Sequence, residues 1–435
     1  MRKLLWLLMW VCTVFFETQA QVLTAEEAVK MALQNNFDIQ LARNAADVTV
    51  INNSAGQAGM LPSIGLNGGF GGGNTNLNQN LADGRVIDRA GVVTNTANAA
   101  VQLNWTLFDG MGMFINRTRL RQLNEAGEQA YRIQVEQTLL DVLTAYYQLV
   151  RQQYVVKVNE QNLKLSDERV RLAGNRYEVG TGSKLDFLQS KVDRNNDHTL
   201  LIQLQQELET SKIKLNQLLG RDVKTTFSVA DSLQQDDALN YEQLYKDALS
   251  KNSLLRLSDI QRGIALQELR MVRAQQLPVV SLNSGYTYNR NKTTAGFLLL
   301  NQNNGVNFGL NASVPLFSGF QLKRQHQQAK LSLRTAELVQ QKQQLDMQAQ
   351  LNTVFVQYSR SKELLNLQKE NVATAKLAME VAMDKFRIGT AGLLEVKNAQ
   401  QNLLNAENRM IEVVLQMKQA EIQLLRVSGN LIKGN

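Results

Sequence analysis

Two carboxylates hold the positions in this sequence that are best suited to chemistry. Asp186 and Glu395 each stand six residues after the glycine of a Gly-Thr pair, in YEVGTGSKLDF (177–187) and FRIGTAGLLEV (386–396). The glycine tolerates the positive φ that a reversing helix requires, and Ser183 with Asp186 has the spacing of a capping box. Both acids then fall in the first turn of a helix, where the dipole stabilises them. The alternative role is a ring of like charges that binds cations in an assembly.

The other candidate chemical groups favour no reaction. His198 and His326 are isolated in polar helical tracts without an acidic residue at ligand spacing, which indicates helix surface rather than metal binding or catalysis. GGFGGGN (68–74) lacks the Lys-Ser/Thr of a phosphate-binding loop and does not open a helix. The sequence contains no nucleophile motif, metal-ligand cluster or cofactor fingerprint. We therefore predict a protein that is not an enzyme and carries neither cofactor nor metal.

Residues 1–20 predict a cleavable secretory signal, with a basic start, an apolar run and the small-residue ending Thr18-Gln19-Ala20. Cys12, the only cysteine, lies in this segment, so disulfides and thiolate chemistry are excluded for the mature chain. No later segment has eighteen uncharged apolar residues, so we expect entry into a membrane only through strands. The formal charge of +8 is interspersed with acids along the helices, which indicates a solvated surface and no nucleic-acid interface.

The chain contains two copies of one unit. At an offset of 216 residues, ALQNN (32–36) matches ALSKN (248–252) and Leu61-Pro62 matches Leu277-Pro278. At an offset of 209 residues, TLFDG (106–110) matches PLFSG (315–319) and the Gly-Thr pairs match each other. One insertion between the proline and the LF-x-G element explains both offsets. We therefore predict a first repeat over 21–220, a connecting segment over 221–240, a second repeat over 241–429 and a tail over 430–435.

Each repeat is predicted to contain one β-hairpin and one long helix. Apolar residues alternate with Gly, Asn and Ser at about 61–109 and 278–317, which is typical of half-buried strands. Gln, Leu, Lys, Glu and Ala dominate 113–179 and 320–388, and each such helix would be about 105 Å long. Shorter helical tracts are expected at 24–60, 183–220, 241–277 and 392–428. Asp109 and Ser318 are the expected N-caps of the long helices.

The four predicted strands cannot close a barrel within one chain. Three chains would supply twelve strands and remove every sheet edge. Outward apolar residues with inward Asn, Ser, Thr and Gly are what a water-filled membrane barrel requires. The alternative is a small sheet that caps a soluble helical bundle and packs its apolar face inward.

These features together resemble the TolC-like outer membrane efflux protein family. The resemblance covers the mature chain and depends on the duplicated order of elements, on LFDG and LFSG (107–110 and 316–319), and on the two glycine turns. It implies a mainly α fold with a membrane β-barrel part, formed by a duplicated helix, β-hairpin, long helix, helix unit. Three protomers would form a twelve-stranded barrel in the outer membrane of a diderm bacterium and an α-helical tunnel through the periplasm.

The resemblance implies a channel for efflux or type I secretion that is gated at its periplasmic tip. A periplasmic adaptor, also called a membrane fusion protein, and an inner-membrane pump would be its partners, with outer membrane lipid around the barrel. The chain departs from the family pattern at Asn36-Phe37 and Asn252-Ser253, where an Asn-Pro pair is common. The connecting segment 221–240 is expected to lie as a belt outside the helices.

The resemblance also assigns roles to residues. Glu395 and Asn398 match the acids that line the constricted entrance, and Asp186 matches an acid whose basic partner is replaced by Ala391, with Arg387 as the nearby substitute. The expected adaptor-docking surface comprises the tip residues Arg176, Tyr177, Val179, Gly180, Thr181, Phe386, Arg387, Ile388, Gly389 and Thr390. Phe108 and Phe317 mark either the aromatic girdle at the barrel edge or simple packing at the strand-to-helix junction.

Two alternatives differ in class from a channel. A secreted or surface-attached helical bundle acting as a structural or adhesive rod would be released from membranes by salt and would not conduct. A periplasmic adaptor also has long helical hairpins, but it would need lipoyl-like and small β-barrel segments and would not need two membrane-type hairpins.

Overall fold

The computed structural model describes residues 21–230 and 239–432, so the predicted signal segment lies outside the described residues. The chain forms two compact units. The first comprises the described residues up to Arg43, Tyr131–Leu255, and those from Gln344 onward. The second comprises Asn44–Ala130 and Arg256–Gln343. Each unit therefore draws on both halves of the sequence.

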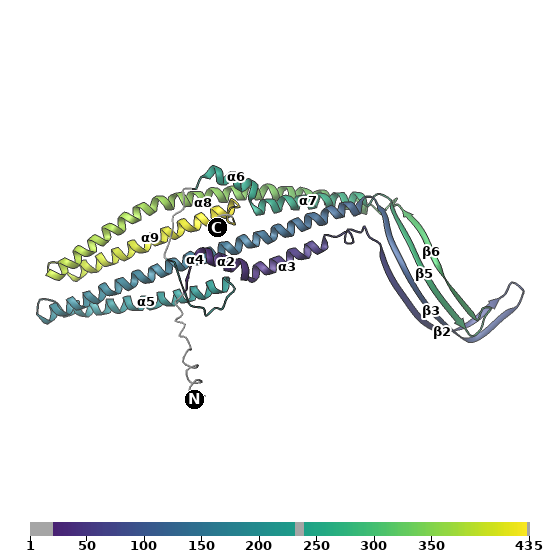
Figure 1. Ribbon diagram of the computed structural model, residues 1–435, viewed down its shortest axis with the longest axis horizontal. Coiled ribbons are helices and arrows are strands. Elements are labelled where there is room, and N and C mark those ends of the chain that lie inside the picture. The colour runs from purple at the N-terminus through teal and green to yellow at the C-terminus, as the bar shows by residue number, and fades with distance from the viewer. Residues whose placement is uncertain (1–20, 231–238, 433–435) are drawn as a thin grey trace, which may run out of the picture. The chain divides into compact units, whose positions relative to one another are not determined.

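The order of elements repeats along the chain (Figure 1). The first half contains the helices α2 (Ala25–Asn35), α3 (Phe37–Asn52), α4 (Gly112–Glu178) and α5 (Lys184–Leu218). The second half contains α6 (Tyr241–Lys251), α7 (Ser253–Ala274), α8 (Gln321–Ile388) and α9 (Leu393–Val427). With 67 and 68 residues, α4 and α8 are each about 100 Å long. Among the described residues, no helix is both long and apolar enough to cross a membrane.

A buried asparagine divides each first helical tract in two, where the sequence predicted single tracts over 24–60 and 241–277. Asn36 separates α2 from α3, its Nδ2 donates to the Leu218 carbonyl at 2.8 Å, and its Oδ1 accepts from the Asp38 N–H at 2.9 Å. Asn252 does the same between α6 and α7, donating to the Val427 carbonyl at 2.9 Å. Because the side-chain amide caps one helix and ties it to another, the chain bends here without proline.

Asn252→Ala is expected to destabilise this junction by about 1–2 kcal/mol, because the buried Val427 carbonyl loses its donor and α7 loses its N-cap. Amide hydrogen exchange across residues 248–256 and 424–428 measures the effect as faster exchange. Asn371→Ala, at an exposed helical position, is the matched control. Equal exchange in both variants would show that the amide does not hold the junction.

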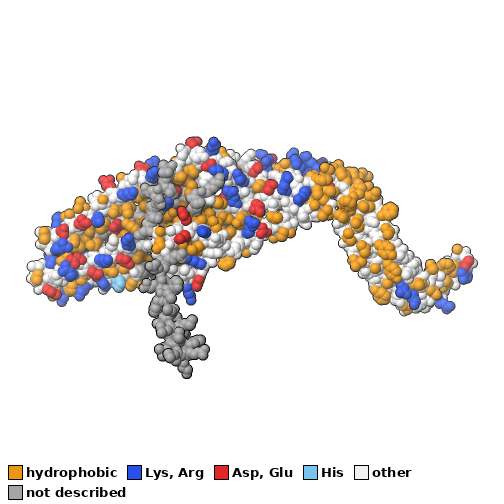
Figure 2. Space-filling view, viewed as in Figure 1, with side chains coloured by type: hydrophobic (Ala, Val, Ile, Leu, Met, Phe, Trp, Pro, Cys, Tyr) orange, Lys and Arg blue, Asp and Glu red, His pale blue; other side chains and the backbone are white. Residues whose placement is uncertain are grey.

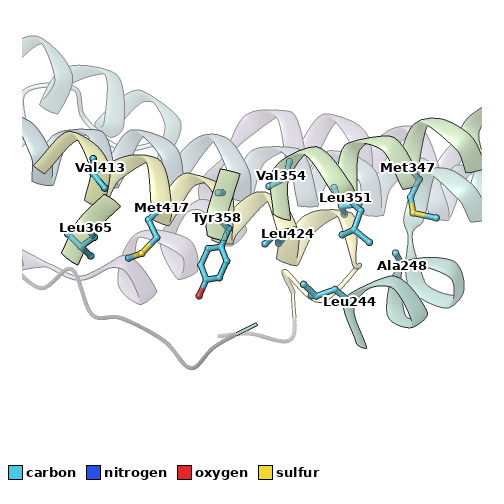
Figure 3. Packing of buried hydrophobic residues seen from close by; sticks show 12 residues of the cluster. Leu244, Ala248, Met347, Leu351, Val354, Tyr358, Leu365, Val413, Met417 and Leu424 are labelled. Carbon is cyan, nitrogen blue, oxygen red and sulfur yellow. The ribbon is translucent and has the colours of Figure 1, made fainter. Parts of the chain in front are cut away.

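The core of the first unit is built from the helical hairpins α4/α5 and α8/α9 and from the shorter elements that pack against each of them. One cluster joins α6, α8 and α9, and its centre includes Leu351 and Leu424, neither of which is exposed (Figure 3). Another cluster joins α2, α4 and α5 to a two-stranded parallel sheet of β1 (Gln21–Leu23) and β4 (Phe227–Val229). The side chain of Phe227 is buried in this cluster. This part of the connecting segment is therefore packed against helices, and residues 231–238 lie outside the described residues.

The second unit contains an antiparallel sheet in the order β2-β3-β5-β6. The strands are β2 (Ser63–Asn80), β3 (Val86–Asp109), β5 (Val279–Thr293) and β6 (Leu300–Ser313). Their register places Leu66, Val101, Tyr286 and Val306 in one row across the sheet. The neighbouring row, on the opposite face, is Gly65, Gln102, Gly285 and Asn307. The predicted alternation of an apolar with a polar face is therefore confirmed in three dimensions.

The strand-to-helix junctions differ from the predicted caps. Asp109 and Ser318 do not directly precede α4 and α8, so neither is an N-cap. Between each of them and its helix lies a glycine and one further residue with positive φ, Gly110-Met111 (69° and 71°) and Gly319-Phe320 (58° and 63°). A Cβ at Gly110 would lie 2.4 Å from the Ala274 carbonyl oxygen, so glycine is required there by space as well as by conformation.

Candidate functional site

The two glycine turns are built alike. Gly180 has φ of 78° and Gly389 has φ of 87°. The Thr181 N–H donates to the Arg176 carbonyl and the Thr390 N–H donates to the Lys385 carbonyl, each at 2.9 Å. These bonds are those of a Schellman motif, which satisfies the last carbonyls of a helix when the next residue adopts positive φ. The predicted positive φ of both glycines at the helix ends is therefore confirmed.

The helices that follow the turns are capped less completely than predicted. Ser183 is the N-cap of α5, and its Oγ accepts from the Leu185 N–H at 3.1 Å. The return bond from Asp186 that would complete a capping box is absent among the described residues, and Gly392 offers no side chain to cap α9. Asp186 and Glu395 do lie in the first turns of α5 and α9, where the helix dipole favours a negative charge.

The predicted constriction residues are exposed on the surface of this single chain. Glu395 Oε1 lies 3.7 Å from Lys385 Nζ, and about half of each side chain is exposed (51% and 53%). Asn398, one turn further along α9, lines the same shallow groove of about 610 Å³. Arg387 does not reach Asp186, because its Nη1 donates to Asp384 on its own helix at 2.9 Å. Asp186 has no ion-pair partner among the described residues.

The predicted tip surface is largely exposed, with one exception. The side chains of Val179 and Ile388 are 73% and 74% exposed, and the Tyr177 ring stacks on Phe187 at 6.2 Å between centroids. Phe386 is only 2% exposed, so its assignment to the exposed surface was wrong. It packs into a cluster with Met379, Met383 and Val396, and the Arg176 guanidinium covers its ring at 5.1 Å. The spacing 379, 383, 386 is that of one buried helix face and signals this outcome.

Phe108 and Phe317, the predicted barrel-edge aromatics, lie in the second unit. Phe108 is 37% exposed and follows a shift in the β3/β5 register between Thr106 and Phe108, which explains why it interrupts the strand alternation. Phe317 is 76% exposed and contacts Phe320 edge to face at 5.5 Å between centroids.

The structure contains a buried polar network near the tip that the sequence did not predict. Arg169 of α4 is 2% exposed and donates from Nη1 to Gln400 Oε1 of α9 at 2.9 Å. Its Nη2 lies 3.6 Å from Oδ2 of Asp193 on α5, and Lys397 Nζ of α9 lies 2.9 Å from Oδ1 of the same carboxylate. Burial lowers the pKa of Arg169, and the nearby carboxylate of Asp193 opposes this shift. The network therefore joins the α4/α5 hairpin of the first repeat to α9 of the second.

Gln400 is the centre of this network. Its Nε2 donates to Oδ1 of Asn162 and to Oγ of Ser166, each at 2.8 Å, and Ser166 donates in turn to Asp197. Nothing in the local sequence distinguishes these residues from the many polar residues on the helix surfaces. Their burial depends on which helices meet, so only packing identifies them.

Two hairpins of long helices that end in exposed glycine turns, and a sheet with one apolar face, together define a subunit of a helical outer-membrane channel. The family model for outer membrane efflux proteins matches residues 28–221 and 244–430, and the chain belongs to this family. It is accordingly an outer membrane efflux protein, and the predicted fold class, localisation and family are confirmed.

Similar proteins agree with this assignment. Outer membrane efflux protein BepC of Brucella suis is 22% identical over 338 residues, which cover 77% of this chain and 73% of that protein. Outer membrane protein TolC of Escherichia coli K12 is 20% identical, covering 94% of this chain and 83% of its own. Among solved structures, VceC of Vibrio cholerae has a TM-score of 0.78 at 17% identity, with 93% of this chain and 96% of that chain covered.

Proposed function

We propose that three copies of this chain form one continuous duct for passive exit across the periplasm and the outer membrane. The supporting observation is the sheet of the second unit, which exposes apolar side chains on one face and ends in two edge strands, β2 and β6. Three such sheets joined edge to edge would give twelve strands and satisfy the free backbone groups. The four helices of each hairpin pair would line or surround the periplasmic tunnel.

The duct would work with a periplasmic adaptor and an inner-membrane pump, in efflux or type I secretion. One similar protein, from Pseudomonas aeruginosa, is named for pyoverdine export, which suits a duct that conducts solutes selected elsewhere. Electron microscopy of the detergent-extracted protein tests the assembly. A threefold rod well over about 100 Å long is expected from the helix lengths. A monomer released from membranes by salt, without conductance, would favour the structural-rod alternative instead.

At the periplasmic tip, we infer that Glu395 contributes to a ring of three carboxylates about the channel axis. Its side chain is half exposed and stands in the first turn of α9, one turn before the exposed Asn398. A ring of like charges concentrates cations and favours divalent ones. Lys385, at 3.7 Å, partly neutralises each carboxylate and so sets the strength of the ring.

Substitutions at this pair are expected to shift divalent-cation block in opposite directions. Glu395→Gln should weaken the block of single-channel current, so that a roughly tenfold higher cation concentration is needed, because it removes the negative charge of the ring. Lys385→Gln should strengthen the block, because it removes the positive charge that offsets each carboxylate. Planar-bilayer recordings with millimolar Mg²⁺ measure the effect. Glu363→Gln, an exposed acid on α8 away from the tip, is the control. Unchanged block in both tip variants would leave Glu395 as a helix-start carboxylate only.

A further inference from the structure

We propose that the helix ends beside the sheet carry a binding collar for the anionic headgroups of phospholipids. The collar consists of four exposed basic residues on α7 and α8, namely Arg270, Arg273, Lys323 and Arg324. The proposal builds on the proposed function, since it requires the strands to stand in a membrane. It adds a lipid class and a leaflet, the one that faces the helices.

The charge balance of these helix ends is strongly positive. Within 110–124, 263–277 and 318–336, Glu268 is the only acidic residue, and the basic residues are Arg117, Arg119, Arg121, Lys330, Arg334 and the four of the collar. Asp109, Glu125 and Glu337 lie just outside these ranges, and the latter two pair with Arg121 and Arg334 rather than with the collar. Figure 2 shows Lys and Arg gathered at the helix ends next to the strands, which carry hydrophobic side chains. Glu268 lies beside Arg119, at 3.7 Å, so it does not neutralise the collar. Lys323, Arg324 and Lys330 have no ion-pair partner among the described residues.

Two arginines of the collar frame a recess suited to a phosphate group. Arg270, Arg273 and His326 line a hollow of about 650 Å³ together with Gly110 and other uncharged residues, without a carboxylate. The Arg273 Nε–H donates to His326 Nε2 at 3.3 Å, and Arg270 Nη1 donates to the neutral Gln267 at 3.3 Å. Neither guanidinium group is paired with a carboxylate among the described residues, and each has further N–H groups beyond the one used in these bonds. One guanidinium group can bind two oxygens of the same phosphate through two parallel hydrogen bonds. A phosphate group is therefore the ligand that best suits the recess.

The collar lies at the depth where headgroups are found. Leu316, Phe317 and Phe320 are 93%, 76% and 62% exposed and mark the end of the apolar surface next to α8. Lys323 and Arg324 follow Phe320 by one helical turn, which is about 5 Å along the axis. The headgroup layer extends about 5–8 Å beyond the hydrocarbon on each side of a bilayer. If the apolar surface is in hydrocarbon, the side chains of Lys323 and Arg324 are level with the phosphates.

The continuity of the collar with the apolar strands favours lipid over a protein partner. A lipid places its tail on the apolar surface and its phosphate on the collar at the same time. Basic residues near an anionic membrane each strengthen binding by about fivefold at moderate salt. The cooperation of the two guanidinium groups with Lys323 and Arg324 would select anionic over zwitterionic headgroups.

Copurifying lipid tests the collar. The wild type and the variant R270Q/R273Q/R324Q are reconstituted into nanodiscs of phosphatidylcholine and phosphatidylglycerol at 7:3, extracted mildly, and analysed by mass spectrometry for bound lipid. We expect severalfold enrichment of phosphatidylglycerol on the wild type and its loss in the variant. The matched control R360Q/K362Q/K369Q removes three basic residues of α8 that belong to the other unit, and should retain the enrichment.

The outcomes separate this inference from the proposed function. Insertion into the nanodiscs and conductance in planar bilayers, without lipid enrichment, would overturn the collar alone. Equal loss in the test and control variants would show general charge attraction and would also overturn it. Failure of the wild type to insert into nanodiscs would contradict both the membrane placement of the strands and the collar.

Discussion

Gly180→Trp is expected to abolish copurification of the periplasmic adaptor while the trimer persists. Gly180 has φ of 78° at an exposed turn, and a Cβ added there meets no atom within 4 Å. The indole would therefore project outward beside the exposed Val179 and disturb only what docks on the tip. The conformational strain of a non-glycine residue at positive φ costs about 1–2 kcal/mol, which a long helical hairpin tolerates.

The matched control for this prediction is Gly180→Ala, which has the same strain without the bulk. We expect Gly180→Ala to retain adaptor copurification and Gly180→Trp to lose it, with Gly389→Trp acting likewise at the second turn. Affinity capture on a tagged adaptor measures docking, and light scattering of the detergent complex measures the trimer. Adaptor recovery at the wild-type level with both tryptophan variants would remove the turns from the docking surface.

Asp193→Leu is expected to destabilise the tip of the first unit by about 3 kcal/mol, because it removes the stronger of the two counter-charges of the buried Arg169 and leaves only Asp197. Asp193 is itself 9% exposed and also accepts from Lys397 and from Gln189 Nε2 at 3.1 Å. The loss should be local, since the network involves only α4, α5 and α9. Amide exchange is expected to accelerate across residues 160–178, 184–197 and 393–404.

A double-mutant cycle separates the ion pair from simple loss of packing. Arg169→Met together with Asp193→Leu removes both charges and replaces them with apolar groups, so it should recover much of the protection that either single change loses. Glu363→Leu, which breaks an exposed pair with Arg360, should leave exchange at the tip unchanged. If amide exchange in Asp193→Leu equalled that of the wild type, the network would make no contribution to the stability of the tip.

The features that follow from local chemistry were predictable. Positive φ at Gly180 and Gly389 depends on the absence of a Cβ. The alternation of side chains on the strands reflects the pleat, so both features depend only on residues that are close in sequence. The duplication made each observation in one repeat a check on the other. In the sequence, Asn36 and Asn252 stand out only as departures from the family pattern, because the carbonyls that these asparagines bind, Leu218 and Val427, are distant in the chain.

The duplicated order of helices and hairpins, the two-faced strands and the glycine turns follow from the sequence, since propensity and periodicity act over a few residues. Helix packing alone decides which residues cover Phe386, namely Val396 and Arg176, and brings Arg169, Asp193 and Gln400 together. A long amphipathic helix carries several candidate faces. Burial is assigned only when another helix packs against one of them, and that helix can be as distant in sequence as Asn162 is from Gln400, 238 residues.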